Sequence, residues 1–405
     1  MTRSTHPATS RPHLSSHPAP LCSSHPAPLC SSHPAPLCSS HPAPPCSSHP
    51  APCVSAAGAR PRRGGTARAA AVAAAGALLL TACGSGADSG ASTAGPDGTF
   101  KAATCPAQPT TTWPEPAPQG GGSHPVRTAM GEVTVPDTPR RVVVLDSAEL
   151  DSALTLGVTP VGATRSDVDS GFLDYLPQQK LAGIKDVGRI GAPNLEAIAA
   201  LKPDLILTSK VRDGQRYAEL KKIAPTVMTE TTGYPWKQNF AVHAAALNKI
   251  PEAERVVAAY RSHAERVTQA LGGPAKARAL RANVVRFVEG ADTRVYGCQS
   301  YIGTVLDDIG TGPTSVVDGA RNGLMVEVGP EQITRADANA VFYSTYGSPE
   351  KSKEAQITAG PLWKNLRAVK DGRSIRVDDQ LWIQGIGYTA ADKILDEIRQ
   401  RLAKK

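Results

Sequence analysis

Residues 141–164, RVVVLDSAELDSALTLGVTPVGAT, decide the fold class of this chain. The segment opens with an apolar, β-branched run at 141–146 that is typical of a buried strand. Residues 148–157 predict a short helix that ends at Gly157, and residues 158–164 predict the next strand. A strand, a helix and a second strand in this order predict a βαβ unit, and therefore an α/β fold.

The same alternation continues along the chain, on both sides of a long helical segment at 237–272. In that segment Val256, Val257 and Tyr260 recur at helical spacing. Further helices are expected at 194–202, 301–310 and 362–369, and further strands at 204–209, 226–230, 283–290, 339–345 and 374–379. We therefore expect an α/β fold of two lobes with largely parallel sheets, separated by one long helix.

The composition divides the chain into six segments. They are a low-complexity repeat at 1–53, a signal peptide at 54–82, a flexible tether at 83–125, an N-terminal α/β lobe at 126–245, a linking helix at 246–273 and a C-terminal α/β lobe at 274–405. About 280 residues follow the tether, which is enough chain for two lobes.

The apolar run at 69–82 is too short to cross a bilayer, which takes about 20 residues. Arginines precede it and small residues close it, as in a secretory signal. Its end, LTAC at 80–83, resembles the bacterial lipobox, which implies that Cys83 is lipidated and becomes the first mature residue. The alternative is an ordinary structural cysteine. Arg62 and Arg63 leave the export route, general or twin-arginine, open.

An octapeptide, SSHPAPLC, repeats through residues 15–53. Its cysteines and histidines would suit a metal-binding tract. However, a signal peptide belongs near the true N-terminus, and a non-ATG start at Val54 would give a signal of ordinary length. We therefore expect that the start was assigned too far upstream and that 1–53 is not part of the protein.

Removing the leader changes the bulk chemistry. Of the 44 basic residues six precede Cys83, and no acidic residue does, so the mature part carries 38 basic against 36 acidic side chains. This near balance argues against a nucleic-acid partner. Cys105 and Cys298 remain and could pair in an oxidising envelope, but Cys105 lies in the expected tether and we expect two free thiols.

The two halves share one acidic position. Glu196 precedes Ile198 and the strand at 204–209, and Glu331 precedes Ile333 and the strand at 339–345 with the same spacing. Each glutamate falls in the first turn of a helix, where its charge offsets the helix dipole by about 0.3–1 kcal/mol. The matched placement predicts a pair of outward-pointing carboxylates, one on each lobe.

Residues 140–402 resemble the class III solute-binding proteins, the iron-siderophore and cobalamin group that supplies ABC importers. The resemblance is carried by the opening segment, by VGRIGAPNLEAIAALKPDLIL at 187–207, by PEQITRADANAVFYSTYG at 330–347 and by the segment 361–398. It implies two lobes joined by one long helix, a ligand cleft between them and modest hinge motion. It also implies that Glu196 and Glu331 form salt bridges with arginines of the permease dimer.

The ligand class follows from the metal-ligating residues. Only His124, His243 and His263 remain in the mature part, without paired spacing, so direct capture of a bare metal ion is not expected. A chelated ion would be held by aromatic faces and guanidinium donors, which suit the oxygens of a ferric hydroxamate. The candidate ligand-binding residues are Arg189, Trp236, Arg286, Tyr301, Tyr346 and Trp382.

Each candidate also has a structural interpretation. Arg286 lies inside an apolar strand and could be a structural ion-pair residue, and Tyr301 could pack at a helix start. Tyr343 could belong to the core or to the cleft, and Trp363 is expected in the core.

No catalytic pattern stands out. GCQSYIG at 297–303 lacks the G-x-S-x-G spacing of a nucleophile elbow, and no phosphate-binding loop occurs. We therefore expect no enzyme and no resident cofactor. The expected protein is a monomeric lipoprotein on the outer face of the cell membrane that binds a ferric siderophore and passes it to an ABC permease. The alternatives are a cobalamin- or haem-binding protein, or a scavenging or sensing module without a permease.

Overall fold

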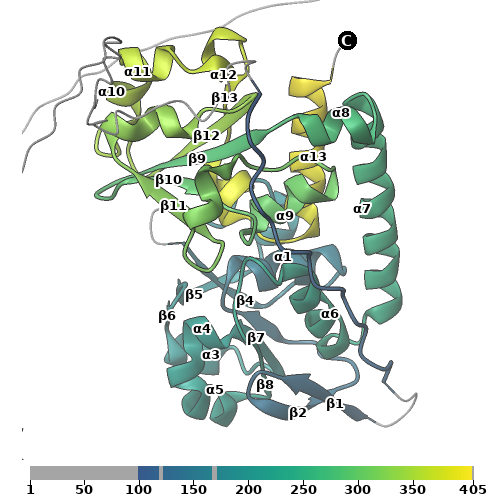
Figure 1. The fold of residues 1–405 in the computed structure, drawn as a ribbon. Helices are drawn as coiled ribbons and strands as arrows, with labels where there is room; N and C mark the ends of the chain where they lie inside the picture. Colours follow the sequence, from purple (N-terminus) through teal and green to yellow (C-terminus); the bar gives the residue numbers. More distant parts are fainter. Residues whose placement is uncertain (1–98, 118–121, 167–170, 404–405) are drawn as a thin grey trace, which may run out of the picture. The chain divides into compact units, whose positions relative to one another are not determined.

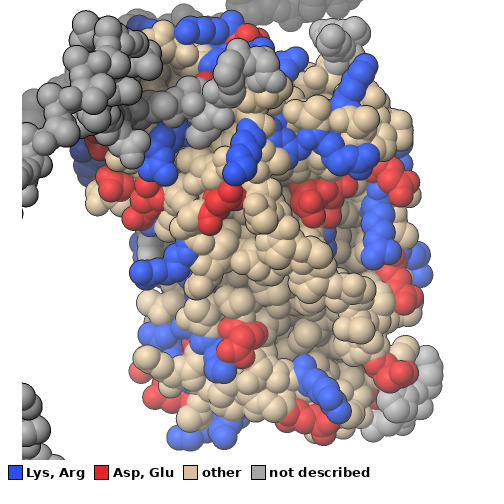
Figure 2. Space-filling model, in the orientation of Figure 1, with Lys and Arg blue, Asp and Glu red and all other residues tan. Residues whose placement is uncertain are grey.

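The computed structural model describes residues 99–117, 122–166 and 171–403, which belong to one compact unit, Ala82–Lys405. The predictions for the repeat, the signal peptide and Cys83 lie outside the described residues. Among the helices of the described ranges none is long and apolar enough to span a membrane. Basic and acidic side chains are interspersed on the face drawn in Figure 2.

The N-terminal sheet contains the predicted βαβ unit. Its six strands run in the order β6-β5-β4-β3-β7-β8, and all pair in parallel except β5 with β6. The strands are β3 (Val142–Val144), β4 (Gly162–Arg165), β5 (Lys185–Arg189), β6 (Ala192–Pro193), β7 (Leu205–Ser209) and β8 (Thr226–Thr229). Helix α1 (Ser147–Thr155) joins β3 to β4, as the spacing predicts. A hairpin that the sequence analysis did not assign, β1 (Ser123–Thr128) and β2 (Gly131–Pro136), precedes the sheet.

The C-terminal sheet is only partly parallel. Its strands run in the order β11-β10-β9-β12-β13, namely β9 (Ala282–Val288), β10 (Thr293–Tyr296), β11 (Met325–Val328), β12 (Ala340–Tyr346) and β13 (Ser374–Arg376). β12 pairs in parallel with β9 and β13, whereas β10 is antiparallel to β9 and β11. The four residues at 289–292 that join β9 to β10 explain this, because a parallel crossover needs a dozen or more.

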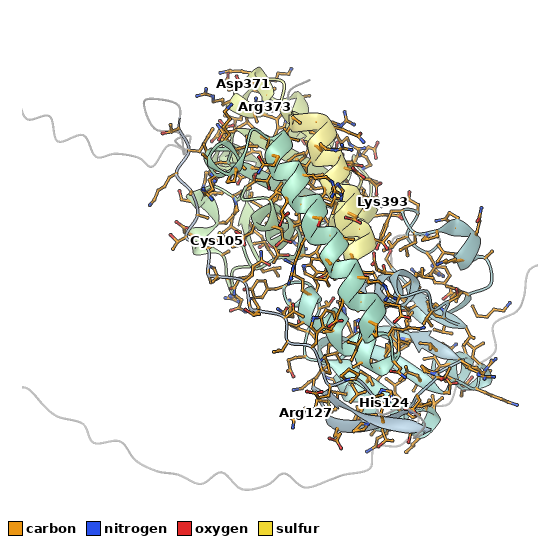
Figure 3. The ribbon with its side chains drawn as sticks, turned by 90° about the vertical axis from the view of Figure 1, so that its right-hand side faces the viewer. Cys105, His124, Arg127, Asp371, Arg373 and Lys393 are labelled. Carbon is orange, nitrogen blue, oxygen red and sulfur yellow. A yellow bond between two sulfur atoms is a disulfide. The ribbon has the colours of Figure 1, made fainter. Side chains whose placement is uncertain are left out.

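One long helix links the two sheets. Helix α7 (Ile250–Ala270) has 21 residues and buries Ile250, Ala253, Val257, Tyr260, Ala264 and Val267, which recur at helical spacing. It packs against α13 (Tyr388–Leu402), a helix that the sequence analysis did not assign, and Figure 3 shows the two side by side. α13 also contacts α1, so the chain's last helix bridges the two lobes (Figure 1).

The remaining helices are short connections around the sheets. They are α2 (Gln178–Leu181), α3 (Leu195–Ala200), α4 (Lys210–Asp213), α5 (Tyr217–Ile223), α6 (Trp236–Ala246), α8 (Pro274–Ala279), α9 (Tyr301–Asp308), α10 (Glu354–Ala359), α11 (Pro361–Lys364) and α12 (Arg367–Lys370), with 3-10 turns η1 (Gly214–Arg216), η2 (Ser315–Gly319) and η3 (Pro330–Ala336) and a π-helical turn η4 (Gln380–Gln384).

Residues 99–117, expected in the flexible tether, instead lie against both lobes (Figure 1), and we call this segment the strap. The Ala103 amide donates to Pro313 O at 3.1 Å, and the Ser315 amide donates to Lys101 O at 2.8 Å. On the N-terminal lobe, Gln238 Nε2 donates to Pro109 O at 2.6 Å. The tether prediction is therefore wrong for this part of the segment.

The strap carries a disulfide bond between Cys105 and Cys298 (Cys105 is labelled in Figure 3). Its pairing with residues 313–315 brings the two Cα atoms to 5.5 Å, within bonding range. The expectation of two free thiols is wrong. It failed because it treated Cys105 as part of a loose segment.

Candidate ligand-binding site

A cavity of about 230 Å³ lies at the carboxyl ends of the strands, where ligands bind in open α/β sheets. Asp146 follows β3, Arg165 ends β4 and Ile190 follows β5, while Arg286 and Tyr346 come from β9 and β12 of the other lobe. We call it the ligand cavity. Its lining is Asp146, Ser147, Leu150, Thr164, Arg165, Ser166, Phe172, Leu173, Ile190, Arg212, Arg286, Tyr346, Ile383, Gln384 and Ile386.

The structure brings two predicted residues together in this cavity. The Arg286 guanidinium lies 4.3 Å from the centre of the Tyr346 ring, a cation–π contact. Arg286 also forms a two-pronged ion pair with Asp379, with Nε to Oδ1 at 2.8 Å and Nη2 to Oδ2 at 2.5 Å. Burial lowers the pKa of Arg286, but the hydrogen bonds and charge interactions with Asp379 and Tyr296 together outweigh burial, and the pKa is raised. Arg286 is therefore both an ion-pair residue and a cavity residue.

Two further arginines line the cavity, and the sequence analysis missed them. Arg212 Nε donates to Asp146 Oδ2 at 2.8 Å, and the Asp146 charge raises the pKa of Arg212. Arg165 Nε donates to Asp186 Oδ2 at 2.5 Å. Both residues stand at or just after a predicted strand end, on the edge of the sheet where ligands bind. Their position along the chain was the available signal.

The rest of the lining is mostly apolar. Leu150, Phe172, Ile190 and Ile383 supply hydrocarbon surface from both lobes. Thr164 is 3% exposed, and its hydroxyl has no hydrogen-bond partner among the residues that the structure describes. A buried hydroxyl without a partner is expected to be paired when a ligand or water fills the cavity. The cavity therefore offers guanidinium donors, one free hydroxyl and apolar walls.

Arg189 lies beside the cavity at the end of β5. Its Nη1 donates to Ser166 O at 3.0 Å, and its neighbour Ile190 is part of the lining. Arg189 itself is not among the lining residues.

Three predicted aromatic residues lie in the core instead of the cavity. Trp236, Tyr301 and Trp382 are 2%, 5% and 0% exposed. Their polar atoms are used inside the protein: Trp236 Nε1 donates to Thr304 Oγ1 at 2.7 Å, Tyr301 Oη to Gly387 O at 2.8 Å, and Trp382 Nε1 to Glu397 Oε2 at 2.8 Å. Buried aromatic side chains with a satisfied polar end are structural. We do not carry these three into the proposed site.

Trp236 and Tyr301 belong to a cluster that joins the lobes. We call it the aromatic junction: Trp236, Phe240, Tyr260, Tyr301 and Tyr388. Its members come from α6, α7, α9 and α13, and its ring centroids lie 4.6–6.0 Å apart. Trp363 is buried in the C-terminal core, as expected, and Tyr343 packs on it with centroids 5.3 Å apart.

The two glutamates occupy matching places. Glu196 lies in the first turn of α3 and Glu331 in the first turn of η3, and both are exposed. Within residues 99–117, 122–166 and 171–403, neither takes part in a salt bridge. Each lobe therefore has one exposed glutamate at this position, and their role stays a prediction.

A cavity between two α/β lobes that the long helix α7 links is the architecture of a two-lobed solute-binding protein. The chain belongs to the periplasmic binding protein family, whose model matches residues 142–381. The resemblance noted from the sequence is thereby confirmed.

The matches between this chain and its named relatives cover most of each relative's length. The probable siderophore-binding lipoprotein YfiY of Bacillus subtilis (strain 168) is 37% identical over 69% of this chain and 87% of the relative. The Fe(3+)-citrate-binding protein YfmC of the same strain is 31% identical, over 68% and 84%. The crystal structure of Staphylococcus aureus SirA complexed with staphyloferrin B matches with a TM-score of 0.61 and 33% identity, over 69% of this chain and 98% of that one.

Proposed function

We propose that the mature protein is a membrane-anchored binding protein that captures a ferric siderophore in the ligand cavity and delivers it to an ABC importer. The observation that carries this proposal is a cavity whose described lining residues include three arginines and one carboxylate, in a chain whose relatives are named for siderophore and ferric citrate binding. Within the described residues, no group of three or more His, Cys, Asp or Glu side chains gathers to hold a metal ion. In this proposal the iron is cargo, held by its chelator.

The arginines suit an oxygen-rich chelate. A guanidinium has five N–H donors, so Arg286 keeps donors for a ligand after pairing with Asp379. Hydroxamate and carboxylate oxygens both accept such bonds. A ferric hydroxamate remains the proposed ligand. The second candidate is a ferric carboxylate chelate, favoured by the excess of cationic over anionic side chains among the described lining residues and by the name of YfmC. Cobalamin and haem stay as alternatives.

Binding is tested by quenching of intrinsic fluorescence in the purified mature protein. The titrants are ferrioxamine, ferrichrome, ferric citrate and cobalamin. We expect saturable quenching by one of the ferric chelates. A response to cobalamin alone would overturn the siderophore proposal.

Delivery is proposed to use Glu196, Glu331 and the lipid on Cys83, because the glutamates are exposed at matching sites and the lipobox precedes the tether. The double reversal Glu196→Lys and Glu331→Lys is expected to abolish uptake of iron chelate while ligand affinity holds. Glu219→Lys, at an exposed first-turn glutamate of α5, is the matched control. Unchanged uptake in the double variant would instead favour a scavenging or sensing module.

A further inference from the structure

Asp151 on α1 is a fully buried carboxylate at the contact between the lobes. Its side chain is 0% exposed and accepts four hydrogen bonds. Two come from the backbone amides of Thr389 and Ala390, at 3.2 and 3.1 Å, in the first turn of α13. Tyr175 Oη donates at 3.0 Å and Thr155 Oγ1 at 3.1 Å. A side chain of the N-terminal lobe thus caps a helix that packs on both lobes.

The bonds from Tyr175, Thr389 and Ala390 connect the two walls of the ligand cavity, whereas the bond from Thr155 lies within α1. Tyr175 follows Phe172 and Leu173, which line the cavity from the N-terminal lobe. The capped amides follow Gln384 and Ile386, which line it from the other side. Gly387 lies between, with φ of 156°, and a Cβ there would collide with the Asp151 carboxylate. The contact between the Asp151 carboxylate and the backbone of Gly387 therefore requires a residue without a side chain at position 387.

The buried position of Asp151 disfavours the charged form of its carboxylate. Burial raises its pKa to about 6 from an ordinary value of 3.8, although the four donors act in the opposite direction. Within the described ranges no salt bridge to Asp151 occurs. Opening the lobes would rehydrate the carboxylate, and water favours its charged form. Ionisation of Asp151 therefore favours opening of the contact between the lobes, and protonation of Asp151 favours its closure.

The other titratable groups around Asp151 come from each element packed on α1. Tyr175, in the segment before α2, and Tyr301, on α9, have pKa values raised well above the usual range by burial, so they stay neutral near pH 7. Glu149 and His243 face each other at 3.5 Å, and His243 Nδ1 lies 3.0 Å from the hydroxyl of Ser152. Asp308 and Tyr388 complete the surroundings of Tyr301.

We propose that Asp151 is a positioning residue for the ligand cavity, that it ties the cavity's two walls together, and that ionisation of its carboxylate loosens this tie. Slower release of bound chelate on acidification follows only if the proposed function holds. The tie itself is a property of the ligand-free protein.

The test is amide hydrogen exchange at Thr389 and Ala390 in the ligand-free mature protein, corrected for intrinsic rates, at about pH 5 and about pH 7.5. We expect protection to be about three- to tenfold greater at the lower pH, since one unit of pKa shift corresponds to tenfold. In Asp151→Asn this pH dependence should vanish. Equal protection at both pH values in the wild type, or an unchanged dependence in the variant, would overturn the proposal.

The matched control is Asp337→Asn. Asp337 is also buried and also accepts backbone amides, from Ala338, Arg367 and Ala368, but all lie within the C-terminal lobe. This variant should keep the pH dependence at Thr389 and Ala390.

If Asp151→Asn does not fold, the variant Tyr175→Phe tests the proposal instead. Removing this donor should move the midpoint of the exchange profile to higher pH, because the Tyr175 bond lowers the pKa of Asp151. An unmoved midpoint would contradict the proposal. If no ferric chelate binds the protein, the proposed function fails while the exchange result still decides the role of Asp151.

Discussion

The ligand cavity and the aromatic junction both draw residues from the two lobes, yet they are built oppositely. The cavity surrounds a hollow with arginines whose guanidinium groups are anchored by aspartates, as Arg286 is by Asp379. The junction is filled by aromatic rings that pack against one another, and the polar atoms of Trp236 and Tyr301 form hydrogen bonds within the protein. Buried aromatic residues therefore hold the lobes together here, while arginines with spare N–H donors line the cavity.

The strap reinforces the junction. Gln108 Nε2 donates to Thr304 O at 3.1 Å and to Asp307 Oδ2 at 2.6 Å on α9. Its Oε1 accepts from Lys237 Nζ of α6 at 2.8 Å, and the same ammonium contacts Asp308. One strap residue thus contacts elements of both lobes. Four experiments test whether the aromatic junction stabilises the fold while the ligand cavity binds the ligand.

The largest effect is expected from Trp236→Ala. Loss of a fully buried tryptophan and of its rings' contacts should lower the free energy of unfolding by about 3–5 kcal/mol. Urea denaturation measures this, and a fluorescence titration of the folded variant measures binding. If stability held and affinity fell instead, Trp236 would be a ligand residue and the contrast would collapse.

Removal of the disulfide comes next. The double variant Cys105→Ser and Cys298→Ser should lower stability by about 2–4 kcal/mol, because the bond closes a long loop of 193 residues' separation. The decrease in Tm should match that of the wild type in dithiothreitol. A variant as stable as the oxidised wild type would show that the disulfide contributes nothing to the stability of the protein.

The pH dependence of the free energy of unfolding should show how much Asp151 contributes to stability. Its pKa is raised by burial in the folded protein, to about 6 against 3.8, so its contribution is fully present below about pH 4 and is lost as the pH rises through about 6. The stability of the wild type relative to Asp151→Asn should therefore fall over this window by at most about 3 kcal/mol. Chemical denaturation across the window measures the difference, and a rise would contradict the assigned burial effect.

Local periodicity was enough to predict the βαβ unit, the long α7 and the burial of Trp363, because these depend on neighbours in the chain. The Cys105–Cys298 bond could not be predicted in this way, since its partners are 193 residues apart and meet only when the strap pairs with the C-terminal lobe.

Of the predicted site residues, Arg286 and Tyr346 line the cavity, because they lie in or at the end of a strand that reaches it. Trp236, Tyr301 and Trp382 were misplaced because loop position does not tell which side of a helix start faces the hollow. Arg165 and Arg212 were overlooked although they stand at or just after strand ends, the feature that proved informative.

The central claim, that the arginine-lined cavity binds the ligand, is tested most directly by comparing Arg212→Gln with Arg216→Gln. Both arginines are partly exposed and paired with an aspartate, but only Arg212 lines the cavity. For the ferric chelate that quenches fluorescence in the wild type, we expect Arg212→Gln to weaken binding about tenfold, as for loss of one hydrogen bond from a charged donor, and Arg216→Gln to leave affinity unchanged. Equal affinities in the two variants and the wild type would contradict the account.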